Sequence, residues 1–300
     1  MSGDRSSRNL LQYVGVLFIA ITLNFLLPRM MPGNPLELIA GQEVGLMSAE
    51  ERQQVISDLG LDRPMYEQYF DYLGDIFTGD FGYSYRQKRL IVDMIIERLP
   101  WTLLLAISSL LFSACVGIIL GALSAWRRGS LSDLILMNAM IILNSLPSFW
   151  VGMLFISIFA VRFGLLPSQG AVTPASGYEN IEYIQDVVAH AILPVLTLSI
   201  LSLPRVYLTM RYTMIGVVGE DFIRTARSKG LAERFILLRH VIPNALIPVV
   251  TVLALRLGYA FGGTVVIETV FSYPGLGRLI FEAVSGRDYP VMQTSFLLFT

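Results

Sequence analysis

The sequence predicts an all-α integral membrane protein with about six membrane-spanning helices. Hydrophobic residues make up 54% of its 300 residues, charged residues only 15%, and the mean hydropathy is +0.61. Three stretches, residues 10–28, 100–126 and 134–161, contain no Asp, Glu, Lys or Arg. Each is close to or longer than the roughly 20 apolar residues that cross a bilayer as a helix. The sequence therefore predicts an integral membrane protein rather than the two soluble domains that its length alone would suggest.

The first helix is expected at about residues 9–30. Arg5 and Arg8 precede an apolar run, as in a signal peptide, but the run is longer than the roughly 7–15 residues of a signal core. No small-residue cleavage site follows it. We therefore expect residues 1–30 to be retained as an N-terminal tail and a first membrane span.

Residues 31–99 form a long polar segment with twelve acidic and six basic residues. Ser48 and Glu51 have the spacing of a capping box, which predicts a helix that runs to about residue 59 and stops at Gly60. A second, amphipathic helix is expected at 66–77, and a turn at 79–82. The segment is therefore predicted to be a small folded cap rather than a linker.

The core domain is expected to occupy residues 100–300. Its spans are predicted at about 100–126, 134–163, 190–210 and 245–271, and a sixth helix begins near residue 289. Pro147 is expected to bend one span, and Pro194 and Pro204 to break the next. Only eleven residues follow the start of the sixth helix, about 16 Å against a hydrocarbon core of about 30 Å. We therefore expect the natural chain to continue beyond Thr300.

Basic residues near the helix ends predict the orientation of the chain. Even numbers of spans separate the N-terminal tail, the loop at Arg127 and Arg128, and the charged stretch 211–244, so all three share a side. The loop 164–189 has no Lys or Arg and lies on the other side with the acidic cap. Because basic loops are cytoplasmic, we expect a cytoplasmic N-terminus and an extracytoplasmic cap.

The charged stretch 211–244 is the candidate functional segment. It is expected to form two short helices joined at Gly230, which can take the left-handed conformation that ends the first helix. Glu220 and Asp221 suit the first turn of that helix, where negative charge favours the helix dipole. The basic residues of the stretch are Arg211, Arg224, Arg227, Lys229, Arg234 and Arg239.

In the second helix, Phe235, Leu238 and Ile242 recur at helical spacing and give an apolar face. Pro243 and Pro248 are expected to interrupt the pattern as the chain re-enters an apolar run. The stretch is then either a basic loop that only fixes orientation or a docking platform for a soluble partner. The platform is favoured, because a loop needed only for its charge does not require an amphipathic helix pair with a glycine hinge.

The pattern Ala226-x-x-x-Gly230, followed ten positions later by His240-Val241-Ile242-Pro243, resembles the coupling loop of ATP-binding-cassette importer permeases. Arg224 and Thr225 stand where the general motif has Glu and Ala. This departure is similar to the dipeptide and oligopeptide branch of the family, which reads R-T-A-x-x-K-G. The resemblance implies that an ATP-binding subunit docks on Glu220, Asp221, Phe222, Arg224, Thr225, Ala226, Lys229 and Gly230.

The resemblance covers nearly the whole chain. Further segments that follow the peptide-permease pattern are residues 31–35, 59–64, 79–85, 265–277 and 287–293. It implies a type I importer transmembrane domain in a multi-pass protein of the bacterial inner membrane. The implied partners are a second, similar permease in a heterodimer, two ATP-binding subunits and an extracytoplasmic substrate-binding protein. The implied cargo is a di- or oligopeptide, with nickel or a metal chelate as the alternative.

The sequence contains no recognisable catalytic or metal-binding cluster. The glycines of residues 258–263 lie in an apolar run without a following Lys-Ser or Lys-Thr, so they indicate close helix packing rather than a nucleotide site. The single cysteine, Cys115, and two distant histidines form no metal-ligand pattern. We therefore expect this chain to have no enzymatic activity, cofactor or nucleic acid partner, with ATP and Mg²⁺ bound by partner subunits.

Three other functional classes are weighed against this reading. A secondary transporter would need relay charges in several spans and internal repeats, and a membrane-embedded enzyme would need a catalytic cluster. A channel would leave the amphipathic helix pair unexplained. The sequence has few charges within its predicted spans, no internal repeats and no catalytic cluster.

Arg205, Arg256 and Glu268 lie within the predicted spans or near their ends. A charge at the centre of a membrane helix costs about 2.5–3.5 kcal/mol on insertion scales, so such residues usually face a cavity or a partner. They are candidates for the path of a charged substrate, in which Arg205 or Arg256 would suit the carboxylate of a peptide. The alternative is snorkelling, or an ion pair within the protein.

Overall fold

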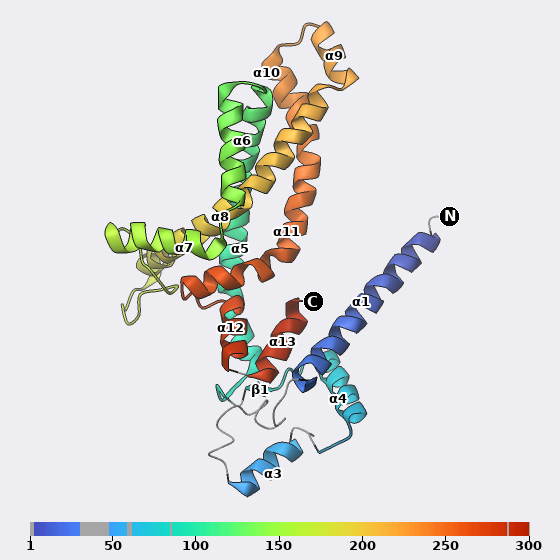
Figure 1. Ribbon diagram of the computed structural model, residues 1–300, viewed down its shortest axis with the longest axis vertical. Helices are drawn as coiled ribbons and strands as arrows, with labels where there is room; N and C mark the ends of the chain where they lie inside the picture. The colour runs from blue at the N-terminus through green and yellow to red at the C-terminus, as the bar shows by residue number, and fades with distance from the viewer. Residues whose placement is uncertain (1–2, 31–47, 59–61, 85, 287, 300) are drawn as a thin grey trace. The chain divides into compact units, whose positions relative to one another are not determined.

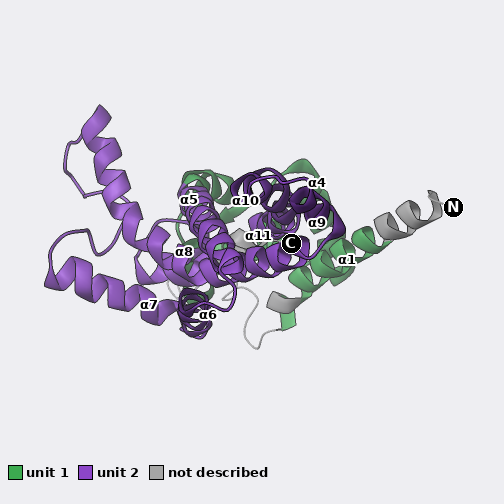
Figure 2. Ribbon diagram, turned by 90° about the horizontal axis from the view of Figure 1, so that it is seen from above, with its two compact units in different colours: residues 1–100, 278–300 green, residues 101–277 purple. Residues whose placement is uncertain are grey.

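The computed structural model describes residues 3–30, 48–58, 62–84, 86–286 and 288–299 (Figure 1). Within these ranges the chain is helical apart from loops and one short hairpin, so the all-α prediction is confirmed. The chain forms two compact units, residues 1–100 with 278–300 and residues 101–277 (Figure 2). We call these unit 1 and unit 2 and describe each by itself.

In unit 1, helix α1 (Gly3–Met30) packs against α13 (Tyr289–Phe299) and α4 (Met65–Thr78). The ring of Phe25 is 1% exposed and lies 5.1 Å from the ring of Tyr69 and 5.5 Å from that of Tyr72. The neighbouring Asn24 Nδ2 donates a hydrogen bond of 2.6 Å to the Gln293 carbonyl oxygen. One end of α1 is thus held by aromatic packing and a polar contact together.

The predicted capping box opens α3 (Ala49–Asp58). The Ser48 N–H donates to Glu51 Oε2 at 2.7 Å, and the Glu51 N–H donates to Ser48 Oγ at 3.2 Å, so this prediction is confirmed. The bond from the Ser48 N–H lowers the pKa of Glu51. Gly60, the predicted stop, lies outside the described residues, whereas α4 ends as expected at Gly79 with φ 73°.

A hairpin joins the cap to the last helices of unit 1. Strand β1 (Tyr83–Ser84) pairs antiparallel with β2 (Arg89–Leu90), and the helix α12 (Leu276–Gly286) precedes α13. Ser84 Oγ donates to Asp288 Oδ2 at 2.5 Å, and both residues are buried. Burial raises the pKa of Asp288, which stands directly before α13. Residues more than 200 positions apart are thereby fastened within one unit.

Unit 2 is built on long apolar helices. Its helices are α5 from residue 101 onward (Ile91–Trp126), α6 (Leu131–Asn144), α7 (Ser148–Phe155), the π-helical η2 (Ile156–Arg162), α8 (Asn180–Val218) and α11 (Ile242–Val270), with shorter elements described below. Helix α8 packs against α6, α7 and α11 (Figure 1). It is therefore the central helix of the unit.

Helix α5 approaches α8 through two glycines spaced four apart. A Cβ atom at Gly117 would lie 2.8 Å from the Val206 side chain, and one at Gly121 would lie 2.7 Å from the Tyr207 carbonyl oxygen. Such small-residue pairs allow the backbones of membrane helices to approach closely. The sequence placed close packing at residues 258–263 instead. This is wrong for Gly258, where an added Cβ would meet nothing within 4 Å.

Replacing Gly121 with Ala is expected to destabilise the chain by about 1–3 kcal/mol, because the nearest obstacle to the new methyl is backbone. The matched control is Gly216→Ala on α8, where the same methyl meets nothing and helix propensity gains up to about 1 kcal/mol. Thermal unfolding of both purified variants in one detergent measures the difference. Equal melting temperatures would contradict the close α5–α8 contact.

The span predicted at 134–163 with a bend at Pro147 is interrupted there more sharply than expected. Helices α6 and α7 are separate and meet at 101°, and the chain between them breaks before Pro147. Proline disfavours helical dihedrals in the residue before it and suits the start of a new helix. A break, rather than a bend, is the result.

Helix α8 was predicted to end near residue 210 and to be broken by prolines. It instead runs unbroken over 39 residues with Pro194 and Pro204 inside it. Pro100 lies inside α5 and Pro248 inside α11 in the same way, so the predicted interruption at Pro248 is also wrong. Membrane helices tolerate proline because neighbouring helices, Ser or Thr side chains and local adjustments satisfy the freed backbone groups.

Among the described residues, three helices have the length and hydropathy of a membrane span. They are Ile91–Trp126, Asn180–Val218 and Glu233–Gly258, and the bent pair of α6 with α7 and η2 adds a fourth if it counts as one span. The apolar part of α1, Gln12–Leu26, is shorter. The membrane fold class is therefore confirmed, and the number six stays a prediction.

Candidate functional site

The charged stretch folds largely as predicted, as a short helix followed by a turn and a second helix. Helix α9 (Asp221–Ser228) follows the end of α8, and α10 (Glu233–Ile236) continues through the π-helical η3 (Leu237–Val241) into α11. The predicted interruption at Pro243 is wrong, because this residue lies at the N-terminus of α11, where proline fits. The second helix is thus continuous with a membrane-spanning one.

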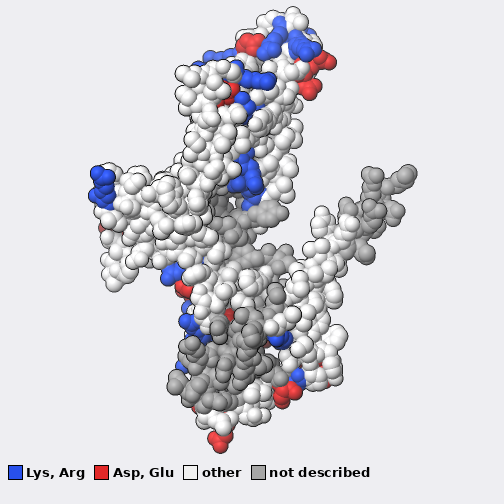
Figure 3. All heavy atoms as spheres, viewed as in Figure 1, with Lys and Arg blue, Asp and Glu red and all other residues white. Residues whose placement is uncertain are grey.

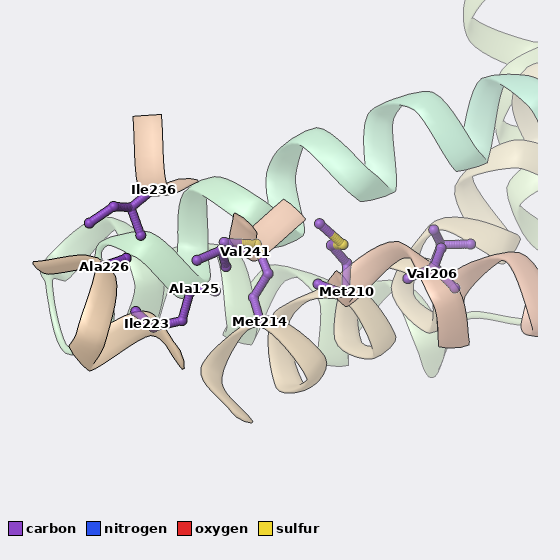
Figure 4. Close-up of a cluster of buried hydrophobic side chains, with 10 residues drawn as sticks. Ala125, Val206, Met210, Met214, Ile223, Ala226, Ile236 and Val241 are labelled. Atoms are coloured by element: carbon purple, nitrogen blue, oxygen red, sulfur yellow. The ribbon is translucent and has the colours of Figure 1, made fainter. Parts of the chain in front are cut away.

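The inner face of α9 is anchored in a buried apolar cluster. Ile223 is fully buried and Ala226 is 7% exposed, and they lie beside Ala125 of α5 and Ile236 of α10 (Figure 4). Met210 and Met214 of α8, Val241 of η3 and residues of α11 complete this anchor cluster. Because packed interiors transmit displacement rather than absorb it, a force on α9 reaches the ends of four helices.

The outer face of the same segment is exposed and mixes apolar with basic side chains. Figure 3 shows charged groups gathered at this end of unit 2. Phe235 and Leu238, predicted to share an apolar face, are 50% and 57% exposed, while Ile236 and Val241 supply the buried contacts. We call the exposed set the α9–α10 surface; it consists of Phe222, Arg224, Lys229, Leu231, Arg234, Phe235, Leu238 and Arg239.

The ends of α9 are fixed by local interactions. Gly230 has φ +71°, and its N–H donates to the Arg227 carbonyl oxygen at 2.9 Å, so the predicted left-handed stop is confirmed. Arg227 binds both carboxylate oxygens of Glu233, at 2.8 and 3.3 Å, which raises the pKa of Arg227 and links α9 to α10. This pair is exposed, so its stabilisation is at most about 1 kcal/mol.

The first turn of α9 is acidic, as expected. Asp221 is its first residue and pairs with Arg224 at 3.3 Å, with both side chains mostly exposed. Thr225 Oγ1 donates to the Asp221 carbonyl oxygen at 3.0 Å. Glu220 stands at the N-cap, but its side chain makes no capping hydrogen bond. These residues therefore shape an exposed helix start, and their role in docking stays a prediction.

Arg211 does not belong to this surface, and its assignment to the basic stretch is wrong. It lies in α8, is 8% exposed and donates from Nε to Asp133 Oδ1 at 2.8 Å and from Nη2 to Asp133 Oδ2 at 2.9 Å. Ser124 Oγ also donates to Asp133 Oδ1, and the Gly129 N–H donates to Asp133 Oδ2 at 3.0 Å. The buried pair fastens the α5–α6 turn to α8 beside the anchor cluster.

Of the three charges predicted within spans, Glu268 is the most enclosed. It is fully buried and accepts a hydrogen bond of 2.8 Å from Thr102 Oγ1, which itself accepts one of 2.8 Å from the Leu276 N–H. A Cβ at Gly275 would lie 2.3 Å from the Glu268 carboxyl carbon. This close packing favours the structural alternative for Glu268, as a residue that holds the loop after α11.

Arg205 and Arg256 lie close enough to each other for their charges to repel, Arg205 exposed on α8 and Arg256 half-buried on α11. The structure thus brings these two predicted residues together. Within the ranges that the structure describes, no group of three His, Cys, Asp or Glu side chains could hold a metal ion.

Comparisons with known proteins show the family to which this chain belongs. Residues 117–300 match the family described as "Binding-protein-dependent transport system inner membrane component", and residues 7–106 match its N-terminal companion. The chain is 37% identical over 300 residues to the dipeptide transport system permease protein of Escherichia coli strain K12, covering 94% of this chain and 88% of the relative. It is 39% identical over 293 residues to the glutathione transport system permease protein of the same strain, covering 98% and 90%.

Among solved structures, the chain resembles the inward-facing MetNI methionine ABC transporter. The TM-score is 0.54 at 18% identity, over 69% of this chain and 88% of that one. At this identity the likeness shows the fold alone.

Proposed function

Because the chain belongs to the binding-protein-dependent transport system inner membrane components, we propose that this importer permease carries di- or oligopeptides across the bacterial inner membrane. The cargo is inferred from relatives named for dipeptide and glutathione transport. Energy would come from ATP hydrolysed on partner subunits, which would also bind Mg²⁺, while this chain would bind no cofactor.

The observation that carries the proposal is the two-sided construction of α9. Its inner face is packed into the anchor cluster, and its outer face belongs to the exposed α9–α10 surface. Exposed aromatic side chains among arginines are the composition of protein-binding hot spots. A partner bound to the α9–α10 surface would be connected to the membrane helices through α9 and the anchor cluster. We infer that this partner is the ATP-binding subunit, so the α9–α10 surface would be cytoplasmic. The even number of predicted spans between them would put the N-terminus on the same side.

Transport would then follow from rigid-body motion. Closure of two ATP-binding subunits would move α9, and the ends of α5, α8 and α11 would move with it through the anchor cluster. The bundle formed with a second permease would open alternately to each side, with the peptide making different contacts in the two states. A substrate-binding protein would deliver the peptide on the outer side.

Replacing Phe222 with Ala is expected to reduce co-purification of the ATP-binding subunits from mild detergent by about tenfold or more, as for a hot-spot aromatic. The second permease should be recovered as before, because Phe222 lies on the α9–α10 surface and not in the spans. Phe163→Ala is the control, since Phe163 is exposed at the end of η2. Subunits are quantified by mass spectrometry, and unchanged recovery with Phe222→Ala would contradict the docking assignment.

A further inference from the structure

Two arginines lie on neighbouring apolar helices of unit 2. Arg256 is the middle residue of the 29-residue helix α11, about 21 Å from either end at about 1.5 Å per residue. Arg205 lies on the neighbouring α8, close enough that the two charges repel. Figure 3 shows a group of basic side chains part-way along the otherwise uncharged column of unit 2.

Neither guanidinium is neutralised by the described part of the chain. Arg256 Nε is buried without a hydrogen-bond partner, and no described carboxylate forms an ion pair with Arg205 or Arg256. The acidic residues of unit 2 are engaged elsewhere or lie at helix ends: Asp133, Glu179, Glu182, Asp186, Glu220, Asp221, Glu233 and Glu268. Two adjacent cations in apolar helices therefore lack an anion.

The pair is partly open in this chain, because Arg205 is exposed and Arg256 is half-buried. In the most apolar 18-residue stretch of each helix, 17% of the residues are buried in Glu233–Gly258, against 33% in Ile91–Trp126 and 44% in Asn180–Val218. An open face with unpaired cations at mid-membrane depth is what a polar path requires and what a lipid-facing surface avoids.

We propose that Arg205 and Arg256 form a binding site for the carboxylate group of the transported peptide, midway through the membrane. The inference rests on the proposed function and adds a place and a chemistry to it. The fork of N–H donors on each guanidinium suits a carboxylate, and two forks side by side can bind its two oxygens. The anion also relieves the repulsion between the arginines, so the site is stabilised while a peptide occupies it.

The first test compares Ala-Ala with its C-terminal amide in vesicles that contain the complete importer. Arg256→Gln and Arg205→Gln are each expected to lower the ratio of Ala-Ala uptake to amide uptake by about tenfold or more. Preferences of the substrate-binding protein cancel in this ratio, because that subunit is unchanged. Arg162→Gln, at the end of η2, is the control and should leave the ratio unaltered. An unaltered ratio in both Arg205→Gln and Arg256→Gln would overturn the proposal.

The second test probes access directly. Cys115 is the only cysteine in the sequence, so a Cys115→Ala, Val252→Cys chain carries a single thiol one helical turn from Arg256 and keeps both arginines. A membrane-impermeant, negatively charged thiosulfonate should label it, and Ala-Ala with ATP should slow the labelling severalfold. A thiol that stays unlabelled, or is labelled equally fast with Ala-Ala, would overturn the proposal and indicate arginines covered by a carboxylate of the second permease.

Failure of the proposed function, peptide transport, would give a different result from failure of the carboxylate site. The Cys115→Ala parent must itself take up Ala-Ala in an ATP-dependent manner. If it does not, the peptide cargo is wrong. If it does and the arginine variants behave like the parent, only the carboxylate site is wrong.

Discussion

Replacing Ala226 with Asp is expected to reduce peptide-stimulated ATP hydrolysis of the assembled importer to its basal rate. Ala226 is 7% exposed and packs in the anchor cluster, so the new carboxylate would be buried without a basic partner. Such a group costs several kcal/mol, and α9 would leave the cluster rather than bear that cost. Insertion into the membrane should persist, because the spans are untouched. ATPase rates with and without Ala-Ala give the result.

The matched control is the same substitution six residues further on. Ala232 is exposed at the N-cap of α10, a position where Asp is favourable, so Ala232→Asp should keep the stimulation.

Gly230→Pro tests independently whether α9 transmits the motion of the ATP-binding subunit. Proline cannot adopt φ +71° and lacks the N–H that binds the Arg227 carbonyl oxygen, whereas Gly230→Asn tolerates the left-handed conformation and should lose much less. Normal stimulation in Ala226→Asp or Gly230→Pro would refute this role of α9.

Replacing Arg211 with Leu is expected to destabilise the chain by about 3–5 kcal/mol, since it leaves the Asp133 carboxylate buried and unpaired. Adding Asp133→Asn should recover part of the loss, because Asn is uncharged and can still accept from the Gly129 N–H. Thermal unfolding in detergent measures both variants against the parent.

The informative result is the order of the melting temperatures of the single and the double variant. A single variant Arg211→Leu that melts within about 2 °C of the parent would contradict the buried pair. A double variant that melts below the single one would show that the charge of Asp133 is satisfied by groups other than Arg211.

The helices were predictable from the sequence wherever hydropathy or caps decide. The apolar runs, the Ser48–Glu51 capping box and the Gly230 stop all appear in the structure. The sequence underestimated the effect of one proline on its helix and overestimated the effect of two others. Pro147 separates two helices, whereas Pro194 and Pro204 lie inside one. A local rule cannot tell these cases apart, because neighbouring helices decide whether the freed backbone groups are satisfied.

For the site, the sequence located the segment but not the orientation of its side chains. The motif marks Ala226 and Phe222 alike, yet Ala226 is anchored inside and Phe222 lies outside. Arg211 was grouped with the basic stretch by position, although its partner Asp133 lies 78 residues earlier. A lone Asp in the first turn of an apolar helix was the available signal, since such a charge needs a partner.

The most direct measurement of the central claim is uptake of Ala-Ala into proteoliposomes. They would contain this chain, its second permease and the ATP-binding subunits, with the substrate-binding protein outside. The account predicts accumulation against a gradient that requires ATP inside and is lost with Ala226→Asp. ATP-dependent uptake of nickel without uptake of Ala-Ala, or equilibration of Ala-Ala without ATP, would contradict it.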